Sequence, residues 1–379
     1  SPAFADLNGD GSDELILADS DGKLHAFRPD LTELPGWPTS SDPIPLASGA
    51  RAYATGALPS VVHAEFAAGP PAIGDLEGDG IPEVVAADSE GKVYVFEPDG
   101  TRKPGFPVQT NRTFSSNAVR NADNRVHWSI TANPILADLN KDGDLEIIAG
   151  ANDRHVYVWE PDGSALNGWP VLIRDPAKVA SVDPTNHKIT FKAGANQRIG
   201  SKIIVPPSVG DLDGDGSLEV LVGVNEEYAE SPNLPDFSPL PGIESGNGRA
   251  YAIKATGLAS PGVPPGAALH PNAFMPGWPV KVPLLALGML PSVATGINGP
   301  PVAADLDGDG KDEVVVQGFA GATMVFKGSG VGFFGRDSSN TDYPLVAGPP
   351  GAASRTDDAS SLAALGGVAL ARLTTEITP

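Results

Sequence analysis

The stretch DLNGDGSDE, residues 6–14, places acidic or amide side chains at its first, third, fifth and ninth positions. The pattern returns four more times, as DLEGDGIPE (75–83), DLNKDGDLE (138–146), DLDGDGSLE (211–219) and DLDGDGKDE (305–313). The first Asp residues are therefore 69, 63, 73 and 94 positions apart. Such spacing indicates an internal repeat of about sixty residues that carries insertions.

Each repeat has the same order of features. A proline opens a short apolar run, the acidic loop follows, and two further β-branched or apolar runs are separated by a turn rich in Asp and Gly. Four repeats then close on a Gly-aromatic-Pro element at 35–38, 104–107, 167–170 and 276–279, whereas the fifth has only DYP at 342–344. Short apolar runs between such turns predict strands rather than helices.

Three clear strands and one less regular strand per repeat predict a four-stranded antiparallel sheet. Sheets of this kind repeated around a ring give an all-β fold, the β-propeller. A linear β-solenoid is the alternative, but its coils are much shorter than sixty residues. We expect a single propeller domain over 1–379, with blades at 1–70, 71–133, 134–206, 207–300 and 301–367, and the start of a next blade at 368–379.

Both ends of the chain suggest a segment of a longer ring. The chain starts at Ser1 without a methionine or a signal peptide, which indicates a processed chain or a piece of a larger one. Residues 369–373, ALARL, align with AFADL at 3–7 and are predicted to form the first strand of a sixth blade. A helix over 359–373 is the alternative, although two glycines interrupt it.

Composition narrows the class of protein. The chain of 379 residues carries a formal net charge of −22, which argues against nucleic acid and anionic membranes as partners. It contains no cysteine, so disulfides and thiolate metal sites are excluded. No apolar run is long enough to span a membrane. The 41% of hydrophobic residues is enough for a packed core.

The acidic loops predict cation sites. Alternating oxygen-bearing side chains in a tight turn converge on one point, and the glycine at position 6 suits a left-handed backbone. Position 7 varies, as expected if only its carbonyl oxygen is a ligand. Oxygen-only ligands with several carboxylates favour Ca²⁺, about one ion per loop. The predicted ligand residues are Asp6, Asn8, Asp10, Ser12, Glu14; Asp75, Glu77, Asp79, Ile81, Glu83; Asp138, Asn140, Asp142, Asp144, Glu146; Asp211, Asp213, Asp215, Ser217, Glu219; and Asp305, Asp307, Asp309, Lys311, Glu313.

These loops are not EF-hands. Position 12 is apolar, as at Leu17 and Ala86, where an EF-hand needs a bidentate Glu. The flanking segments are predicted strands, not helices. Position 2 is always Leu, which we expect to anchor the loop in the core of its blade. Solvated Asp-Gly turns without a metal are the alternative, but a turn needs Asp-Gly only at its tip.

Together with their flanking strands, the loops resemble the FG-GAP/VCBS repeats of bacterial surface and secreted proteins, and more distantly the integrin α-subunit propeller. The resemblance implies a propeller with one calcium ion per loop on an extracellular protein. It departs from the integrin pattern because position 9 is Glu rather than Asp. Only AGAN, residues 149–152, is similar to the Gly-Ala-Pro element of integrins. Integrin-type ligand binding is therefore not expected.

Other residues give weaker signals. No catalytic motif is visible, and the six histidines are interpreted as surface or packing residues. The aromatic residues of the closing elements are expected to pack between blades rather than to stack on sugars. Trp128 and Trp159 are interpreted as strand core. The insertions at 171–205, 228–248 and 255–275 are either spacers or binding loops.

These features favour a calcium-stabilised extracellular β-propeller that acts as a binding, adhesion or assembly module. Its expected partners are a protein or carbohydrate ligand at the cell surface or neighbouring subunits of a surface assembly, without nucleic acid or membrane insertion. Two alternatives remain. The chain could be the propeller of a secreted polysaccharide lyase, or a structural spacer in a surface fibre.

Overall fold

The computed structural model describes residues 1–44, 51–57, 61–115, 127–195, 197–200, 202–228, 230, 243–259, 269–287, 296–297, 299–318 and 323–333. The chain divides into two compact units, one with residues 1–195, 200–207 and 255–273, the other with 196–199, 208–254 and 274–379. The segments 342–344, 359–373 and 369–373, on which several predictions depend, lie outside the described residues.

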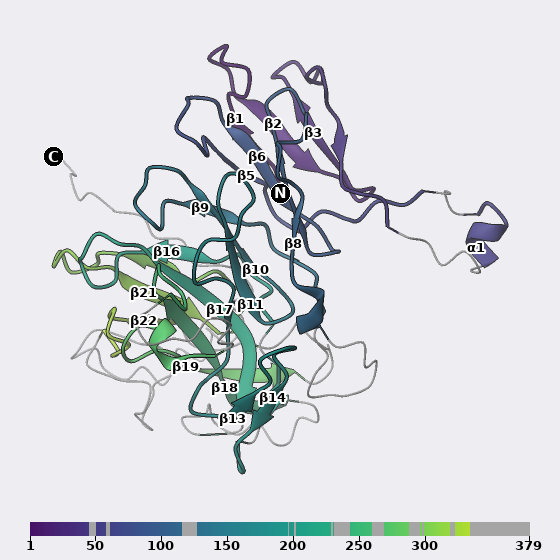
Figure 1. The fold of residues 1–379 in the computed structure, drawn as a ribbon. Helices are drawn as coiled ribbons and strands as arrows, with labels where there is room; N and C mark the ends of the chain where they lie inside the picture. The colour runs from purple at the N-terminus through teal and green to yellow at the C-terminus, as the bar shows by residue number, and fades with distance from the viewer. Residues whose placement is uncertain are drawn as a thin grey trace. The chain divides into compact units, whose positions relative to one another are not determined.

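The first unit contains three four-stranded antiparallel sheets, as the sequence predicted (Figure 1). The first sheet is β1 (Ala3–Ala5), β2 (Glu14–Ala18), β3 (Lys23–Phe27) and β4 (Thr39–Ser40). The second is β5 (Ala72–Gly74), β6 (Glu83–Ala87), β7 (Lys92–Phe96) and β8 (Val108–Gln109). The third is β9 (Ile135–Ala137), β10 (Glu146–Gly150), β11 (His155–Trp159) and β12 (Val171–Leu172). Each sheet keeps its strands in chain order.

The second unit contains two further sheets. One is built from β16 (Ser208–Gly210), β17 (Glu219–Tyr228), β18 (Ile243–Ile253) and β19 (Val280–Leu287). A strand that the sequence did not predict, β15 (Gln197–Ile199), also pairs with β17 and makes this sheet five-stranded. The other consists of β20 (Val302–Ala304), β21 (Glu313–Gln317) and β22 (Thr323–Phe326). Its predicted fourth strand falls after residue 333, outside the described residues.

Few described residues are helical. The helical elements are α1 (Arg51–Ala54), η1 (Arg112–Phe114) and η3 (Pro271–Ala273). None of the helices in the described parts of the chain has the length and apolar character needed to cross a membrane. A hairpin of β13 (Val179–Val182) and β14 (Ile189–Phe191) lies within the insertion 171–205. This insertion also supplies β12.

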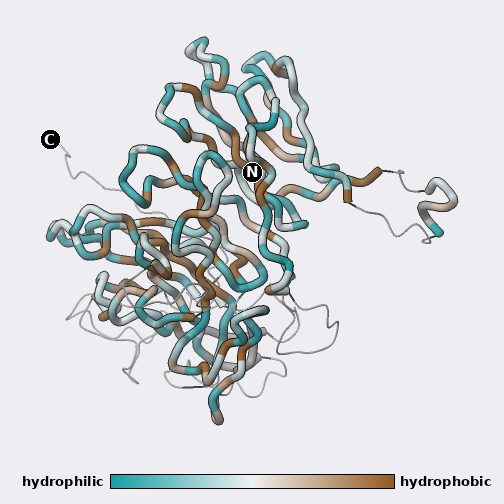
Figure 2. Tube along the Cα trace, viewed as in Figure 1, coloured by the Kyte–Doolittle hydropathy of each residue, from teal (hydrophilic) through white to brown (hydrophobic). Residues whose placement is uncertain are grey.

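The second sheet is buried on both faces, which explains the continuous apolar run EVVAA. Successive side chains of a strand point to opposite faces. Val84 and Ala86 of β6 pack in a cluster with residues of the first sheet, such as Ile16. Val85 and Ala87 pack in a second cluster with residues of the third sheet, such as Ile147. Consecutive sheets of the first unit therefore stack face to face, as blades of a propeller do. In Figure 2, brown hydrophobic stretches of the chain alternate with teal hydrophilic ones.

The closing elements connect one sheet to a later part of the chain. Three tryptophans donate Nε1–H to backbone carbonyls: Trp37 to Pro98 O at 2.9 Å, Trp169 to Ala255 O at 3.1 Å and Trp278 to Gly328 O at 2.8 Å. All three side chains are buried. The prediction that these aromatics pack rather than face ligands is confirmed for the tryptophans, and each precedes a cis proline, as Phe106 does.

A glycine before each closing aromatic allows this close approach. Gly36 has a φ of +89°, in the left-handed region that side chains disfavour. A Cβ at this position would collide with the carbonyl oxygen of Asp99 in the second sheet's turn. The Gly-aromatic-Pro pattern is therefore a sheet-to-sheet contact, not a solvent-exposed turn.

Two interpretations of single residues need correction. Trp159 is buried at the end of β11, as predicted, but Trp128 lies in no strand and is half-buried. The guanidinium carbon of Arg112 lies over the Trp128 ring, 4.4 Å from the ring centroid, in a cation–π contact. Arg112 is the first residue of η1. Leu306, unlike its four counterparts, is 43% exposed rather than anchored in the core. The corresponding Leu76 packs against the next sheet, and any sheet after residue 333 is outside the described residues.

Candidate metal-binding loops

Each acidic loop joins the first strand of its sheet to the second. The first Asp organises the turn by accepting, through Oδ2, a hydrogen bond from the amide of the glycine at position 6. The N–O distances are 2.8 Å for Gly11–Asp6, 2.7 Å for Gly80–Asp75, 3.1 Å for Gly143–Asp138, 2.9 Å for Gly216–Asp211 and 3.1 Å for Gly310–Asp305. All five glycines have φ between +78° and +99°, so the predicted left-handed backbone is present.

The residue at position 5 fixes the exit of the turn. Its Oδ1 accepts from the amide at position 7, at 2.9 Å for Ser12–Asp10, 2.8 Å for Ile81–Asp79, 3.0 Å for Asp144–Asp142, 2.7 Å for Ser217–Asp215 and 3.0 Å for Lys311–Asp309. The Ile81 side chain is 47% exposed, and that of Lys311 is also exposed. The position 7 side chain is thus free to vary, because the loop uses its main chain.

The glutamate at position 9 begins the second strand and is buried in all five loops. One of its oxygens, Oε2, accepts from the amide of the leucine at position 2. The distances are 3.0 Å for Leu7–Glu14, 2.9 Å for Leu76–Glu83, 2.6 Å for Leu139–Glu146, 2.9 Å for Leu212–Glu219 and 3.0 Å for Leu306–Glu313. This bond closes the base of the loop and holds one carboxylate beneath the exposed ones.

Carboxylates converge in three of the loops. One oxygen from each of three residues lies within 4.8 Å of the others in the sets Asp138, Asp142, Glu146; Asp211, Asp213, Glu219; and Asp305, Asp307, Glu313. Each set combines exposed or half-buried aspartates with a buried glutamate. Such an arrangement of oxygen ligands suits a hard cation such as Ca²⁺.

Burial raises the pKa of the base glutamates of the second to fifth loops. The pKa of Glu146 is raised to about 7, first by burial and further by the nearby carboxylate of Glu160. The pKa of Glu219 is also raised to about 7, by burial and by Asp213, Asp215 and Asp211. Burial likewise raises the pKa of Glu313. Ionised carboxylates are therefore unfavourable here unless a cation balances them.

The second loop differs because a lysine enters it. Lys103 Nζ lies 2.5 Å from Glu77 Oε1 and 3.2 Å from Glu83 Oε1. It is also 3.4 Å from Glu97 Oε1. The loop pattern in the sequence does not point to this lysine, because Lys103 follows Glu83 by 20 residues. The signal was the glutamate at position 3, where the other loops have Asn or Asp.

A second set of polar contacts recurs at the ends of the second and third strands. Tyr94 OH donates to Asp88 Oδ2 at 2.9 Å, and Tyr157 OH donates to Asp153 Oδ2 at 2.6 Å. The backbone amide of Asp42 donates to Tyr94 OH at 2.8 Å, which ties the end of the first sheet to the second. Tyr157 OH receives a 3.1 Å bond from the amide of Asn111 in the same way. These contacts are structural, and periodicity alone did not reveal them.

Two histidines form a buried pair in the first unit. His155 Nε2 and His187 Nδ1 are 2.7 Å apart, and the His187 ring stacks on Phe114 with 3.8 Å between centroids. Burial, followed by His155 and Arg154, lowers the pKa of His187 to about 3. The interpretation of these histidines as packing residues fits this environment, since both side chains are buried.

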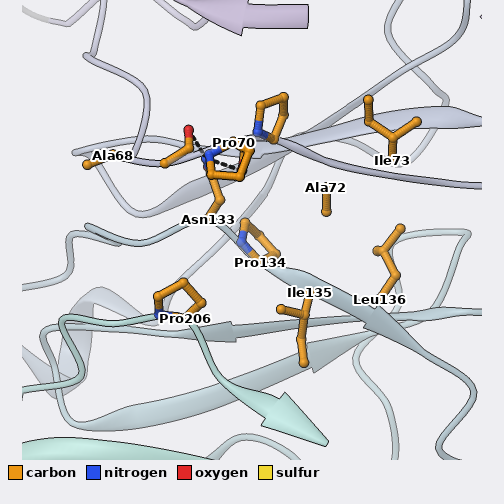
Figure 3. Close-up of a pocket in the computed structure, with 11 residues that line it drawn as sticks. Ala68, Pro70, Ala72, Ile73, Asn133, Pro134, Ile135, Leu136 and Pro206 are labelled. Atoms are coloured by element: carbon orange, nitrogen blue, oxygen red, sulfur yellow. Dashed lines mark hydrogen bonds between the residues drawn. The ribbon is translucent and has the colours of Figure 1, made fainter. Parts of the chain in front are cut away.

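A cavity of about 390 Å³ lies at the start of β5 and β9. Its lining is mainly proline and aliphatic, including Pro70, Ile73, Pro134 and Leu136 (Figure 3). The Asn133 amide at its edge donates to Pro70 O at 2.8 Å and to Gly69 O at 3.0 Å. Its polar group is thus engaged with the protein, so the cavity offers no set of polar groups for a ligand.

Comparisons with known proteins agree with the loop pattern. Residues 75–149 match the model of the FG-GAP-like repeat. Comparison with curated proteins finds no match. The insertions at 228–248 and 255–275 lie partly outside the described residues, so their predicted roles stay predictions.

Solved structures show remote similarity. BamB from Moraxella catarrhalis is 12% identical, with a TM-score of 0.40, over 87% of this chain and 60% of that protein. Quinohemoprotein alcohol dehydrogenase from Comamonas testosteroni is 14% identical, with a TM-score of 0.43, over 87% of this chain and 41% of that one. Rhamnogalacturonan lyase YesW is 16% identical, with a TM-score of 0.35, over 87% and 52%. The chain spans less than two thirds of each of these proteins, and the similarities are too remote to indicate function.

The family match runs from Asp75 to Ala149 and covers the second loop, the strands β6 to β9, the third loop and most of β10. The loops at 6–14, 211–219 and 305–313 repeat the same hydrogen bonds from position 6 to position 1 and from position 2 to position 9. The chain therefore contains an FG-GAP-like repeat within an all-β fold of antiparallel sheets of the β-propeller type.

Proposed function

We propose that the chain is a calcium-stabilised extracellular propeller that serves as a binding or assembly module at the cell surface. The observation that carries the proposal is the convergence of three carboxylates within 4.8 Å in the loops at 138–146, 211–219 and 305–313. The buried glutamate in each set needs a positive partner when ionised, which a divalent cation supplies. Millimolar calcium outside cells suits sites of modest affinity, for which Kd is roughly 10⁻⁴–10⁻³ M.

The net charge of −22 supports the same role. Several bound divalent ions would lower the self-repulsion of so acidic a chain. FG-GAP-like repeats, of which residues 75–149 are one, are typical of extracellular proteins. With cations in its acidic loops, the chain presents its other loops to a protein, a carbohydrate or a neighbouring subunit.

Calcium binding is tested by equilibrium dialysis with radioactive calcium on the purified chain. We expect Asp211→Asn and Asp305→Asn each to remove one ion per chain, because each changes the residue that both organises the loop and faces the cation. The matched control is Asp99→Asn, which removes one exposed carboxylate outside the loops. Unchanged stoichiometry in the loop variants, or no calcium binding by the parent chain, would contradict the proposal.

The surface role needs a separate measurement. The chain, labelled at its amino terminus, is applied to arrays of polysaccharides and to whole cells in calcium and in chelator. Saturable binding that depends on calcium would support a binding module. If the chain binds calcium but neither polysaccharides nor cells, and associates end to end with itself, the result would favour the structural spacer.

A further inference from the structure

The five sheets that contain the acidic loops share one further backbone hydrogen bond. The donor is the backbone N–H of a residue near the closing element, two positions before its glycine in the first four sheets. The acceptor is a backbone carbonyl near the end of the third strand of the repeat. The bonds are Leu34–Ala26 at 2.8 Å, Lys103–Val95 at 2.9 Å, Leu166–Val158 at 3.0 Å, Met275–Ala252 at 2.9 Å and, in the fifth sheet, Phe333–Val325 at 2.9 Å. Four of these residues are hydrophobic and one is a lysine.

The lysine at this position reaches into its own loop. Lys103 is only 12% exposed, and its ammonium contacts the oxygens of Glu77, Glu83 and Glu97 at 2.5, 3.2 and 3.4 Å. Glu83 is the buried glutamate at the base of the loop, with 2% side-chain exposure. An ammonium this close to a buried carboxylate supplies a positive charge that balances it.

The rest of the second loop is adapted to this lysine. Glu77 stands at position 3, where its longer side chain reaches the ammonium, whereas the other loops carry Asn or Asp. Glu97 follows β7 and adds a third carboxylate to the same ammonium. Among the described residues, the converging carboxylate sets belong to the third, fourth and fifth loops, and neither the first loop nor this one has such a set.

The other lysine near a loop is placed differently. Lys327 Nζ lies 3.1 Å from Asp307 Oδ2 in the fifth loop, but its side chain is 41% exposed. Asp305, Asp307 and Glu313 still converge beneath it. An exposed single ion pair of this kind contributes little and leaves the loop open to a cation.

We propose that Lys103 is a tethered cation that takes the place of the metal ion in the second loop, so that residues 75–83 keep their turn without calcium. The inference rests on the proposed function, because it compares a loop that needs no calcium with loops that bind calcium. It predicts fewer ions per chain than acidic loops. It also predicts that removing the ammonium makes the second loop dependent on calcium.

The test is amide hydrogen exchange, read on peptides that cover 75–83 and 211–219, in calcium and in chelator. Lys103→Met provides the variant, because methionine stands at the corresponding position 275. Lys92→Met is the control, since Lys92 is also half-buried and paired, but with Asp42 at 2.6 Å outside the loop. In the parent chain we expect chelator to make amide exchange about tenfold faster at 211–219 and to leave the exchange rate at 75–83 unchanged. The factor is about ten because calcium at ten times Kd shifts the equilibrium between the closed and the open loop by about that amount.

In Lys103→Met we expect exchange at 75–83 to become about tenfold faster in chelator and to recover in calcium, with one more ion bound per chain. Parent-chain loops that respond equally to chelator would overturn the inference and leave the calcium proposal standing. If neither loop responds to calcium, the calcium proposal fails. In that case, unchanged exchange at 75–83 in Lys103→Met would overturn the tethered cation too, whereas faster exchange would support it. The parent-chain comparison decides the matter even if Lys103→Met does not fold.

Discussion

The backbone amide of Leu139 donates a 2.6 Å hydrogen bond to Glu146 Oε2, while Glu146 Oε1 is buried and accepts no hydrogen bond from the described residues. An ionised carboxylate in this state is half satisfied, and the neighbouring Glu160 adds a like charge. Buried polar groups without partners cost about 1–3 kcal/mol. A cation in the third loop would therefore give this oxygen a partner and offset the like charge of Glu160.

Removal of calcium is expected to lower the melting temperature. At a calcium concentration ten times Kd, each occupied loop contributes about 1.4 kcal/mol to the free energy of unfolding. Several loops together contribute a large part of a net stability of about 5–15 kcal/mol. Calorimetry in calcium and in excess chelator measures this, with magnesium as the control cation. An identical melting curve, with calcium loss confirmed by elemental analysis, would show that the loops need no ion.

The first aspartate of a loop is expected to matter more than the fifth-position residue, even in chelator. Asp6 accepts from the amides of Gly9, Asp10 and Gly11 at 2.8, 3.1 and 2.8 Å, whereas Asp10 accepts from Ser12. At about 0.5–1.5 kcal/mol per bond, Asp6→Ala should cost about 2–3 kcal/mol and Asp10→Ala about 1 kcal/mol. Urea unfolding in chelator gives both values. Equal losses would mean that these bonds do not organise the turn.

The closing tryptophan is expected to stabilise the chain mainly by packing. Trp37→Phe removes the hydrogen bond to Pro98 O but keeps an aromatic ring, as Phe106 does at the corresponding position. We expect a loss of about 1 kcal/mol, against about 3–5 kcal/mol for Trp37→Ala. Chemical denaturation distinguishes the two. A loss in Trp37→Phe as large as in Trp37→Ala would assign the main role to the indole N–H instead.

Stability is expected to fall as the pH drops below neutral, through His187. Its pKa is lowered from 6.5 to about 3 in the folded chain, so between these values the unfolded chain binds a proton that the folded chain does not. That group alone should reduce the free energy of unfolding by about 2 kcal/mol between pH 7 and pH 5. Urea titrations at fixed, saturating calcium compare the parent with His187→Gln. Parallel pH profiles for the two chains would refute the assignment.

Much of the fold was readable because each sheet repeats the same short-range signals. The runs EVVAA and EIIAG became β6 and β10, and the glycines at position 6 adopted the expected backbone. What the sequence did not reveal depends on contacts between distant positions. Lys103 meets Glu83 across 20 residues, and His155 meets His187 across 32. No periodicity marks such pairs, because they follow from how the sheets and insertions pack.

The position 2 leucines show the limit of a local pattern. Leu7, Leu76, Leu139 and Leu212 are buried, but Leu306 is 43% exposed, although the five loops are nearly identical in sequence. Leu7 packs with residues of the second sheet and Leu76 with residues of the third, so burial at this position involves a neighbouring sheet as well as the loop itself. Likewise, the extra strand β15 is added to the edge of β17 by a segment that reads as an irregular insertion.

The hydrogen bonds from the tryptophan indoles also determine when each sheet can be completed during synthesis of the chain. Trp37 belongs to the first sheet, but its acceptor, Pro98 O, is synthesised 61 residues later. At about 5–20 residues per second on the ribosome, that delay is roughly 3–12 s. Trp169 waits for a carbonyl 86 residues ahead and Trp278 for one 50 residues ahead. During translation each sheet therefore emerges with one face still open, and it is completed only when the chain beyond it has left the ribosome.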